Sequence, residues 1–285
     1  MRNTVFGSAT AIIAACLCVH AVAQSTPTGA NDSTAAQAQL TRVDTSATLA
    51  KNQPVVIDNP YGDVRLRFGG YEHAVASHAV VQQPNGAAVI VLQPSVVEGH
   101  YRIAPRLPEG VRITDDQRLD LVVFVAEGHS VTVRTEQGQI ESRGIRADID
   151  LQSTSGNIAI RGTQGSVQAR TAGSGSVEAS LGPAPAGSTQ RLATRTGTII
   201  LAVDEKLDAE LQMSTSAAFA TEYSLQVEQL PGKEPNKTAK TTIGVARATI
   251  ILQSLRGEIR LLRWNGFTAA DASSSEEKQV KGDSN

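Results

Sequence analysis

Cysteine and aromatic residues are scarce in this sequence, and their scarcity excludes several kinds of protein. Only two cysteines occur among 285 residues, Cys16 and Cys18, so the rest of the chain can form neither disulfides nor thiolate metal sites. Aromatic residues make up 4% of the chain, which argues against a carbohydrate-binding platform of stacked rings. The fold must therefore be stabilised by an aliphatic core.

Strong charge of one sign is also missing. The chain has 26 Lys and Arg against 28 Asp and Glu, a formal net charge of −2. Such a balance gives no electrostatic basis for binding nucleic acid or an anionic membrane. After the N-terminal segment, no apolar run approaches the length of about 20 residues that a membrane-spanning helix needs. The sequence therefore predicts no nucleic-acid partner and no transmembrane segment in the mature chain.

The N-terminus, by contrast, has the pattern of a secretory signal peptide over residues 1–23. Arg2 precedes an apolar stretch at 9–19, and Ala21-Val22-Ala23 fits a small-x-small cleavage site. Two alternatives remain open, namely an uncleaved membrane anchor and a lipoprotein-type sequence that would place a lipid on Cys16. The favoured interpretation is export to the periplasm or the cell exterior.

Composition divides the remaining chain into three parts. Residues 24–50 are rich in Ser, Thr, Ala and Gln, which predicts a flexible lead-in. Residues 267–285 are polar and charged, which predicts a disordered tail. Between them, residues 51–266 are long enough for one ordered domain.

A glycine followed two residues later by an aliphatic residue recurs six times within this domain. From position 138 to position 197, consecutive copies lie 18, 19 and 22 residues apart. A period near 20 indicates stacked units, because one such unit cannot bury its own apolar side. The glycines of the repeat are Gly62, Gly138, Gly156, Gly175, Gly197 and Gly257.

Polar and aliphatic residues alternate after each glycine, which is typical of strands with one face in a core. Five before the glycine the residue is also aliphatic, except at Arg170. Glycine itself suits a turn with positive φ or a close backbone approach. The aliphatic residues expected to form one buried column are Ile140, Ile158, Val177, Ile199 and Ile259. The predicted fold class is all-β: a single elongated β-solenoid or β-helix-like domain with repeats of about 20 residues and a less regular N-terminal β portion.

Two segments interrupt the repeat. Pro84-Asn85-Gly86 lies between the apolar runs 79–81 and 89–92, which predicts a two-residue β-hairpin. Residues 231–241 are polar and contain two prolines, which predicts a loop inserted between repeats.

These motifs resemble a family of exported bacterial adhesin-like proteins whose domain has no known function. Residues 56–64, Val-Ile-Asp-Asn-Pro-Tyr-Gly-Asp-Val, are similar to the family's opening "I-x-N-x-x-G-x-V". Residues 119–128 are similar to its "L-x-x-x-V-P-x-G" step, with Ala126 in place of the usual proline. The resemblance covers about residues 51–263. It implies a β-solenoid-like domain on the cell envelope, and it assigns no functional residues.

No catalytic or metal-binding arrangement stands out. Asp148 and Asp150 could hold a cation, although a solvated outer face is the favoured interpretation of this pair. His73 and His78 differ by an odd number, so a strand would point them to opposite sides. The sequence therefore predicts no cofactor, no metal and no enzymatic activity. The alternative function is a polysaccharide-acting β-helix enzyme whose groove would contain Asp148 and Asp150.

A possible binding flank is formed by three arginines. Arg67, Arg143 and Arg161 each lie five residues after a repeat glycine, so stacking would align them on one side. Such a stripe suits acidic sugars, although a solubilising outer face is the favoured interpretation of these arginines. The predicted function is that of a non-enzymatic exported envelope protein, which presents an extended β surface to an unknown envelope protein or surface polymer.

Overall fold

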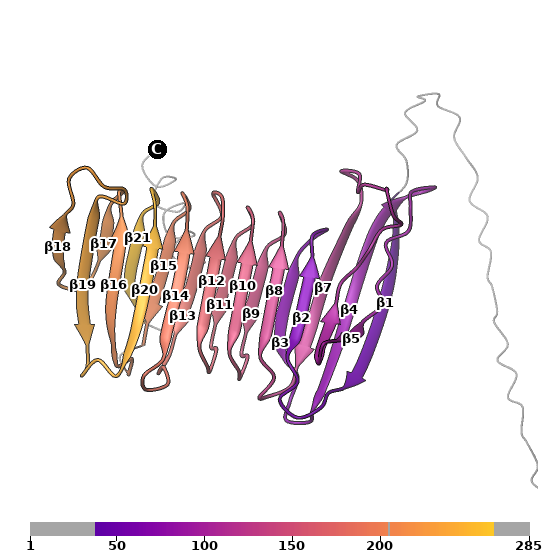
Figure 1. Ribbon diagram of the computed structural model, residues 1–285, viewed down its shortest axis with the longest axis horizontal. Coiled ribbons are helices and arrows are strands. Elements are labelled where there is room, and N and C mark those ends of the chain that lie inside the picture. The colour runs from indigo at the N-terminus through magenta and orange to yellow at the C-terminus, as the bar shows by residue number, and fades with distance from the viewer. Residues whose placement is uncertain (1–37, 205, 265–285) are drawn as a thin grey trace, which may run out of the picture. The chain divides into compact units, whose positions relative to one another are not determined.

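The chain folds into two large β-sheets, as a computed structural model shows for residues 38–204 and 206–264 (Figure 1). No helix occurs within these residues, and none of their segments forms a helix able to cross a membrane. The predicted all-β class is therefore confirmed. The predicted signal peptide (1–23) and tail (267–285) lie outside the described residues.

The first sheet has ten strands, most of them parallel. In spatial order they are β1 (Ala38–Thr48), β4 (Ala74–Pro84), β7 (Arg118–Val125), β3 (Val64–Phe68), β9 (Ile140–Arg143), β11 (Ile158–Arg161), β13 (Val177–Leu181), β15 (Ile199–Val203), β21 (Ile259–Arg263) and β17 (Phe219–Thr221).

The second sheet has eleven strands. In spatial order they are β18 (Gln226–Gln229), β19 (Lys237–Ile243), β16 (Ala209–Thr215), β20 (Ala248–Ser254), β14 (Thr189–Thr194), β12 (Val167–Thr171), β10 (Ile149–Ser153), β8 (Val131–Thr135), β2 (Val55–Asn59), β6 (His100–Ile103) and β5 (Ser95–Val97).

From β8 to β15 the chain alternates between the two sheets, so each strand pairs in parallel with the strand two elements later. At both ends this order breaks down, because β1 and β4 pair antiparallel at one end and β18 and β19 do so at the other. The body is therefore a pair of sheets rather than a closed solenoid.

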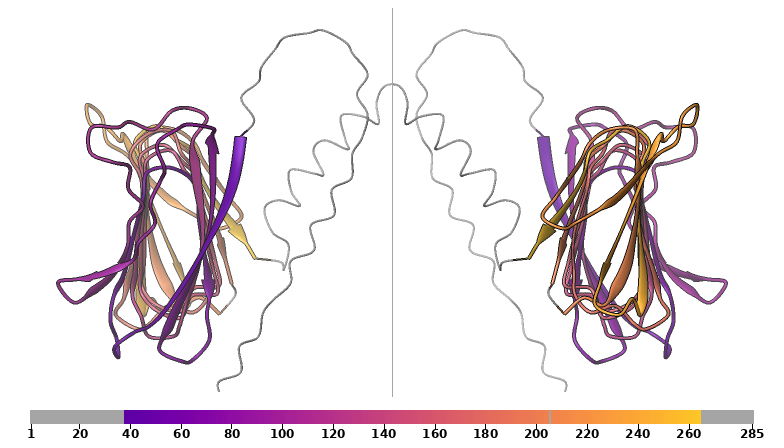
Figure 2. Two further views of the ribbon diagram at one scale, coloured as in Figure 1. Left: turned by 90° about the vertical axis from the view of Figure 1, so that its right-hand side faces the viewer. Right: turned by 90° about the vertical axis from the view of Figure 1, so that its left-hand side faces the viewer.

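The core lies between the two sheets (Figure 2). Buried and partly exposed residues alternate along the strands, as the period of two requires. Ile158 pairs in register with Ile140 and Val177, and the row continues to Ile199 and Ile259. All five side chains are at most 1% exposed. The expected buried column is present.

The repeat glycines stack directly on one another. A Cβ added to Gly156 would overlap the Gly138 carbonyl oxygen and come within 2.6 Å of the Gly138 carbonyl carbon. The same clash with the preceding glycine would arise at Gly175 and Gly197. None of these glycines is among the residues with positive φ. Close approach of neighbouring backbones, rather than a special turn conformation, is the reason for glycine here.

Buried hydroxyl groups accompany the glycines and satisfy their carbonyl groups. Thr135 Oγ1 donates to the Gly138 carbonyl at 2.9 Å, and Thr194 Oγ1 donates to that of Gly197 at 2.7 Å. Both threonines are buried, so a carbonyl left without this partner would be costly. The turns at Gly138 and Gly197 thus depend also on a threonine three positions before each glycine.

The sequence-based account of the N-terminal region needs two corrections. The hairpin at Pro84-Asn85-Gly86 does not form, because β4 pairs along its length with β1 and β7 instead. Both partners offer longer antiparallel pairings than the short run 89–92. β1 itself falls inside residues 24–50, so part of the expected flexible lead-in is an ordered strand paired over eleven residues.

Candidate binding surface

The three arginines predicted as a flank lie side by side on the outer face of the first sheet. Arg143 on β9 is in register with Arg67 on β3 and with Arg161 on β11. Adjacent strands in a sheet are about 4.8 Å apart, so the three Cα atoms span roughly 10 Å. The structure therefore brings together all the residues that the sequence singled out, although their binding role stays a prediction.

Two of these arginines have acidic partners and one has none. Arg67 pairs with Glu141 at 2.9 Å, and Arg161 pairs with Glu178 at 3.4 Å. Arg143 is exposed, and its side chain makes no hydrogen bond or ion pair with any described residue. Like charges directly opposite each other on a sheet are destabilising. The central guanidinium thus lies between two others, and a bound anion would relieve that repulsion.

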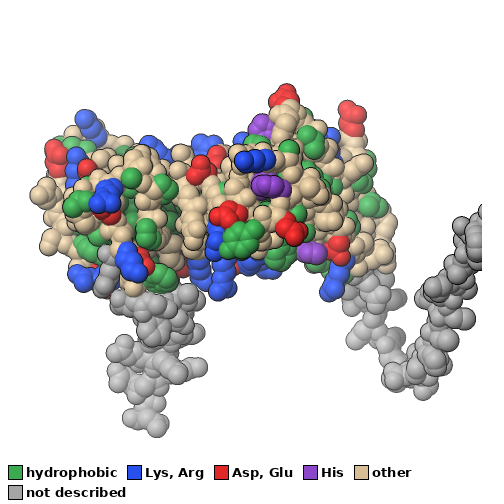
Figure 3. Space-filling model, turned by 90° about the horizontal axis from the view of Figure 1, so that it is seen from below, with side chains coloured by type: hydrophobic (Ala, Val, Ile, Leu, Met, Phe, Trp, Pro, Cys, Tyr) green, Lys and Arg blue, Asp and Glu red, His purple; other side chains and the backbone are tan. Residues whose placement is uncertain are grey.

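Basic side chains also stand out in the space-filling view, where blue groups gather along the lower edge near the middle of the body (Figure 3). Red acidic groups also occur on this face, and Arg67 and Arg161 are each ion-paired with a glutamate. The surface is consequently patterned rather than uniformly positive. Such a pattern suits spaced negative charges better than a continuous anionic backbone.

The outer face of the second sheet carries another row of polar side chains, which sequence reasoning missed. Arg134, Gln152 and Arg170 are in register on β8, β10 and β12, and the row continues to Ala193 on β14. Arg170 lies five residues before its glycine, whereas Arg134 lies four before Gly138. The turn after β12 is one residue longer, so Ala169 takes the core position and Arg170 faces outward.

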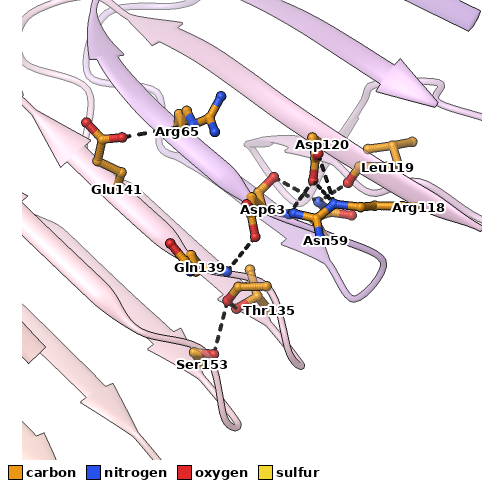
Figure 4. Close-up of polar contacts among 11 residues, drawn as sticks. Asn59, Asp63, Arg65, Arg118, Leu119, Asp120, Thr135, Gln139, Glu141 and Ser153 are labelled. Atoms are coloured by element: carbon orange, nitrogen blue, oxygen red, sulfur yellow. Dashed lines mark hydrogen bonds and ion pairs between the residues drawn. The ribbon is translucent and has the colours of Figure 1, made fainter. Parts of the chain in front are cut away.

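A polar cluster joins the segment between β2 and β3 to β7 (Figure 4). The Asn59 side-chain amide, fully buried, donates to the Leu119 carbonyl at 2.8 Å and to the Asp63 carbonyl at 3.3 Å. Asp63 in turn accepts a hydrogen bond from the Gln139 backbone N–H at 2.8 Å and pairs with Arg118 at 2.7 Å. These contacts give the Asn and Asp of the opening motif a structural role.

Arg118 is held between two carboxylates in this cluster. Its Nε lies 2.8 Å from Asp120 Oδ1, and a second nitrogen reaches Asp63. Partial burial opposes the charged guanidinium, but hydrogen bonds and charge from Asp120 and Asp63 outweigh it and raise the pKa of Arg118. The guanidinium is thus committed to internal pairing and is not free to bind a ligand.

Replacing Asn59 by alanine is expected to lower the free energy of unfolding by about 1–3 kcal/mol, because a buried carbonyl then loses its donor. Urea unfolding followed by circular dichroism would measure the change. Gln139→Ala is the matched control, since only its backbone N–H takes part and its side chain is exposed. Equal stability of both variants would contradict the assigned role of Asn59.

Asp148 and Asp150 do not form a free carboxylate pair. Asp148 Oδ1 accepts the Ser166 backbone N–H at 2.7 Å, and Asp150 Oδ2 accepts the Gln152 amide at 2.9 Å. Asp148 is thus engaged by a residue next to β12, and Asp150 by a neighbour on its own strand β10. No set of three or more His, Cys, Asp or Glu side chains arranged to hold a metal occurs within the described residues.

Two histidines that look unrelated in the sequence meet in the fold. His73 Nδ1 lies 3.0 Å from His129 Nε2, and His129 is fully buried with its Nδ1 against the Gln53 carbonyl at 2.9 Å. The alternation of side chains along one strand could not reveal this pair, because the two residues lie 56 positions apart in the sequence. All nitrogen atoms of the buried ring have protein partners.

No family model matches the sequence, and no curated protein matches it.

Two solved structures are similar at low identity. A "putative cell adhesion protein" from Clostridium sporogenes ATCC 15579 is 9% identical with a TM-score of 0.47, over 79% of this chain and 100% of that chain. A "putative adhesin" from Bacteroides fragilis NCTC 9343 is 8% identical with a TM-score of 0.30, over 78% of this chain and 97% of that chain. At these values neither protein's description carries over to this chain.

Proposed function

We propose that this chain is a non-enzymatic, exported protein of the cell envelope that binds another macromolecule through the outer face of its first sheet. The observation that carries the proposal is the in-register set of Arg67, Arg143 and Arg161, in which Arg143 has no acidic partner within residues 38–204 and 206–264. An exposed, uncompensated guanidinium between two others is suited to an anionic group on a partner.

The arrangement of the strands supports this use of the surface. We infer that residues 131–203 form stacked units of about 20 residues, each with one strand in either sheet. The stacked glycines and the in-register aliphatic column favour this arrangement. Stacked units present broad, shallow faces, which suit contacts with a large partner better than enclosure of a small molecule.

The proposed location follows from the sequence pattern. Residues 1–23 have the features of a secretory signal, which would deliver the mature chain to the periplasm or the exterior. The resemblance of residues 51–263 to exported adhesin-like proteins agrees with an envelope role. The partner is accordingly an envelope protein or a surface polymer, and the ordered domain begins no later than β1.

The test is crosslinking in the native host, with partners identified by mass spectrometry after cell fractionation. We expect a reproducible partner in the exported fraction, and we expect its recovery to fall at least about tenfold when Arg143 and Arg161 are both changed to Glu, as loss of charge-assisted contacts predicts. The loss of partner recovery in this variant should be larger at low salt than at high salt, because salt screens the charges that the variant reverses.

Arg42→Glu is the matched control, because Arg42 is an exposed arginine on β1, far along the sheet from β9 and β11. It should leave recovery of the partner unchanged. Equal loss in this control would point to net charge rather than to the arginine row. A cytoplasmic location with no partner would refute the proposal.

A further inference from the structure

We propose that a second binding site, for an extended glycan chain bearing carboxylate groups, lies in a groove on the outer side of the second sheet. Two adjoining depressions form this groove, with volumes of about 610 Å³ and 360 Å³. They share Arg170, Thr171 and Ala172, so they form one continuous channel across β8, β10, β12 and β14. This site lies in the sheet opposite the Arg143 row and does not depend on it.

Small residues keep the groove open while longer polar side chains line it. Ala172 and Ala193 lie along its length, where larger side chains would fill the channel. Gln152, Thr154 and Gln253 line the same channel and offer amide and hydroxyl groups. Groups that both donate and accept hydrogen bonds match the hydroxyl-rich edges of a sugar chain.

Three guanidinium groups supply the positive charge. They belong to Arg134, Arg170 and Arg195. Arg170 is exposed, and its hydrogen-bond partner is the neutral Gln152 at 2.7 Å, so no carboxylate in the described part of the chain neutralises it. Arg134 contacts Asp58 at 3.4 Å, but Asp58 is bound more closely by Arg102 at 2.6 Å. Arg170 is therefore the groove arginine best placed for an anionic ligand, and Arg134 shares its carboxylate partner with Arg102.

The neighbouring acidic groups narrow the class of ligand. Asp58 and Glu136 line the first depression near Arg134, with Asp58 on β2 in register with Arg134, so this end of the groove carries both signs of charge. A polyphosphate backbone, with charge on every unit, would be repelled by these carboxylates. Arg134 and Arg170 lie two strands apart, about 9.6 Å. The groove thus fits a polymer whose negative charges are spaced rather than continuous.

Two other ligand classes fit less well. A peptide that binds as an added strand needs a free sheet edge, whereas β8, β10, β12 and β14 are each paired on both sides. A neutral glycan is usually bound by stacking on aromatic rings, and the residues lining the groove include none. Carboxylates, by contrast, form paired hydrogen bonds with guanidinium groups.

The test is isothermal titration calorimetry of the full exported chain with polygalacturonate and with alginate. Fully methyl-esterified polygalacturonate and dextran serve as uncharged comparisons. We expect at least one carboxylated polymer to bind about tenfold or more tightly than either uncharged one, with affinity that falls as salt rises. Changing Arg170 and Arg195 together to Gln should weaken this binding at least about tenfold.

Arg143→Gln with Arg161→Gln is the matched double variant on the opposite sheet, and it should bind the polymer as the unchanged protein does. Failure of both carboxylated polymers to bind, or equal binding of the methyl ester, would overturn the groove proposal. Loss of polymer binding in the Arg143 and Arg161 variant alone would also overturn it, while leaving the proposed function intact. Unfolding midpoints of both double variants would show that each remains folded.

Discussion

Replacing Gly156 by alanine is expected to destabilise the protein by about 3 kcal/mol or more, because the new methyl group would overlap backbone atoms that cannot move aside. The added Cβ would meet the carbonyl group of Gly138, with the carbonyl carbon at 2.6 Å. Relief of that contact requires the segments before β9 and β11 to separate, which also disturbs the pairing of these two strands. Urea unfolding monitored by circular dichroism would measure the loss.

Gly182→Ala is the matched control for this effect. Nothing lies within 4 Å of a Cβ built at Gly182, and its φ is not in the positive region. Alanine there should leave stability unchanged or raise it by about 0.4–1 kcal/mol, since it restricts the unfolded chain. A Gly156 variant as stable as the Gly182 variant would disprove close backbone packing as the reason for the glycine column.

Truncation of Ile158 to alanine is expected to cost about 2–5 kcal/mol, as it does for buried isoleucine in general. Ile158 is 1% exposed and lies between Ile140 and Val177 in the buried column, so the cavity would be enclosed on both sides. Neighbouring strands hold these side chains in place, and the column cannot easily collapse into the space. Thermal and urea unfolding would both report the change.

Asn157→Ala provides the comparison one residue away. Asn157 is exposed, and its Oδ1 accepts the Ser176 backbone N–H at 2.8 Å, so its loss should cost only about 1 kcal/mol. A cost for Asn157 equal to that for Ile158 would argue against the predicted alternation of buried and exposed sides. The comparison thus tests directly which residues of β11 and of the turn before it face the core.

The stacked part of the fold was predictable because its signals are local. Each glycine is followed two residues later by an aliphatic side chain, and this spacing alone places Ile140 and Ile158 in one buried row. The three arginines of the first sheet were aligned correctly for the same reason, since all lie five residues after a glycine without an intervening insertion. Their function, however, depends on a partner that no spacing reveals.

The rest of the fold could not be predicted, because there the pairing of strands depends on segments that are distant in the sequence. Pro84-Asn85-Gly86 has good turn chemistry, yet the strand before it finds longer partners in β1 and β7. β1 lies in a polar stretch whose composition indicates disorder, and it is ordered through pairing with β4. The groove was missed because one additional turn residue shifts Arg170 out of the glycine-based alignment and into register with Arg134.

Three of the four strands at the ends of the two sheets are short, which is expected to limit growth into filaments. β1 has eleven residues, whereas β17 at the opposite edge of the same sheet has three. The second sheet ends in β5 and β18, with three and four residues. A copy adding head to tail could therefore pair only a few residues at each junction. Short outer strands of this kind stop a stack of parallel strands from acting as a template for its own polymerisation.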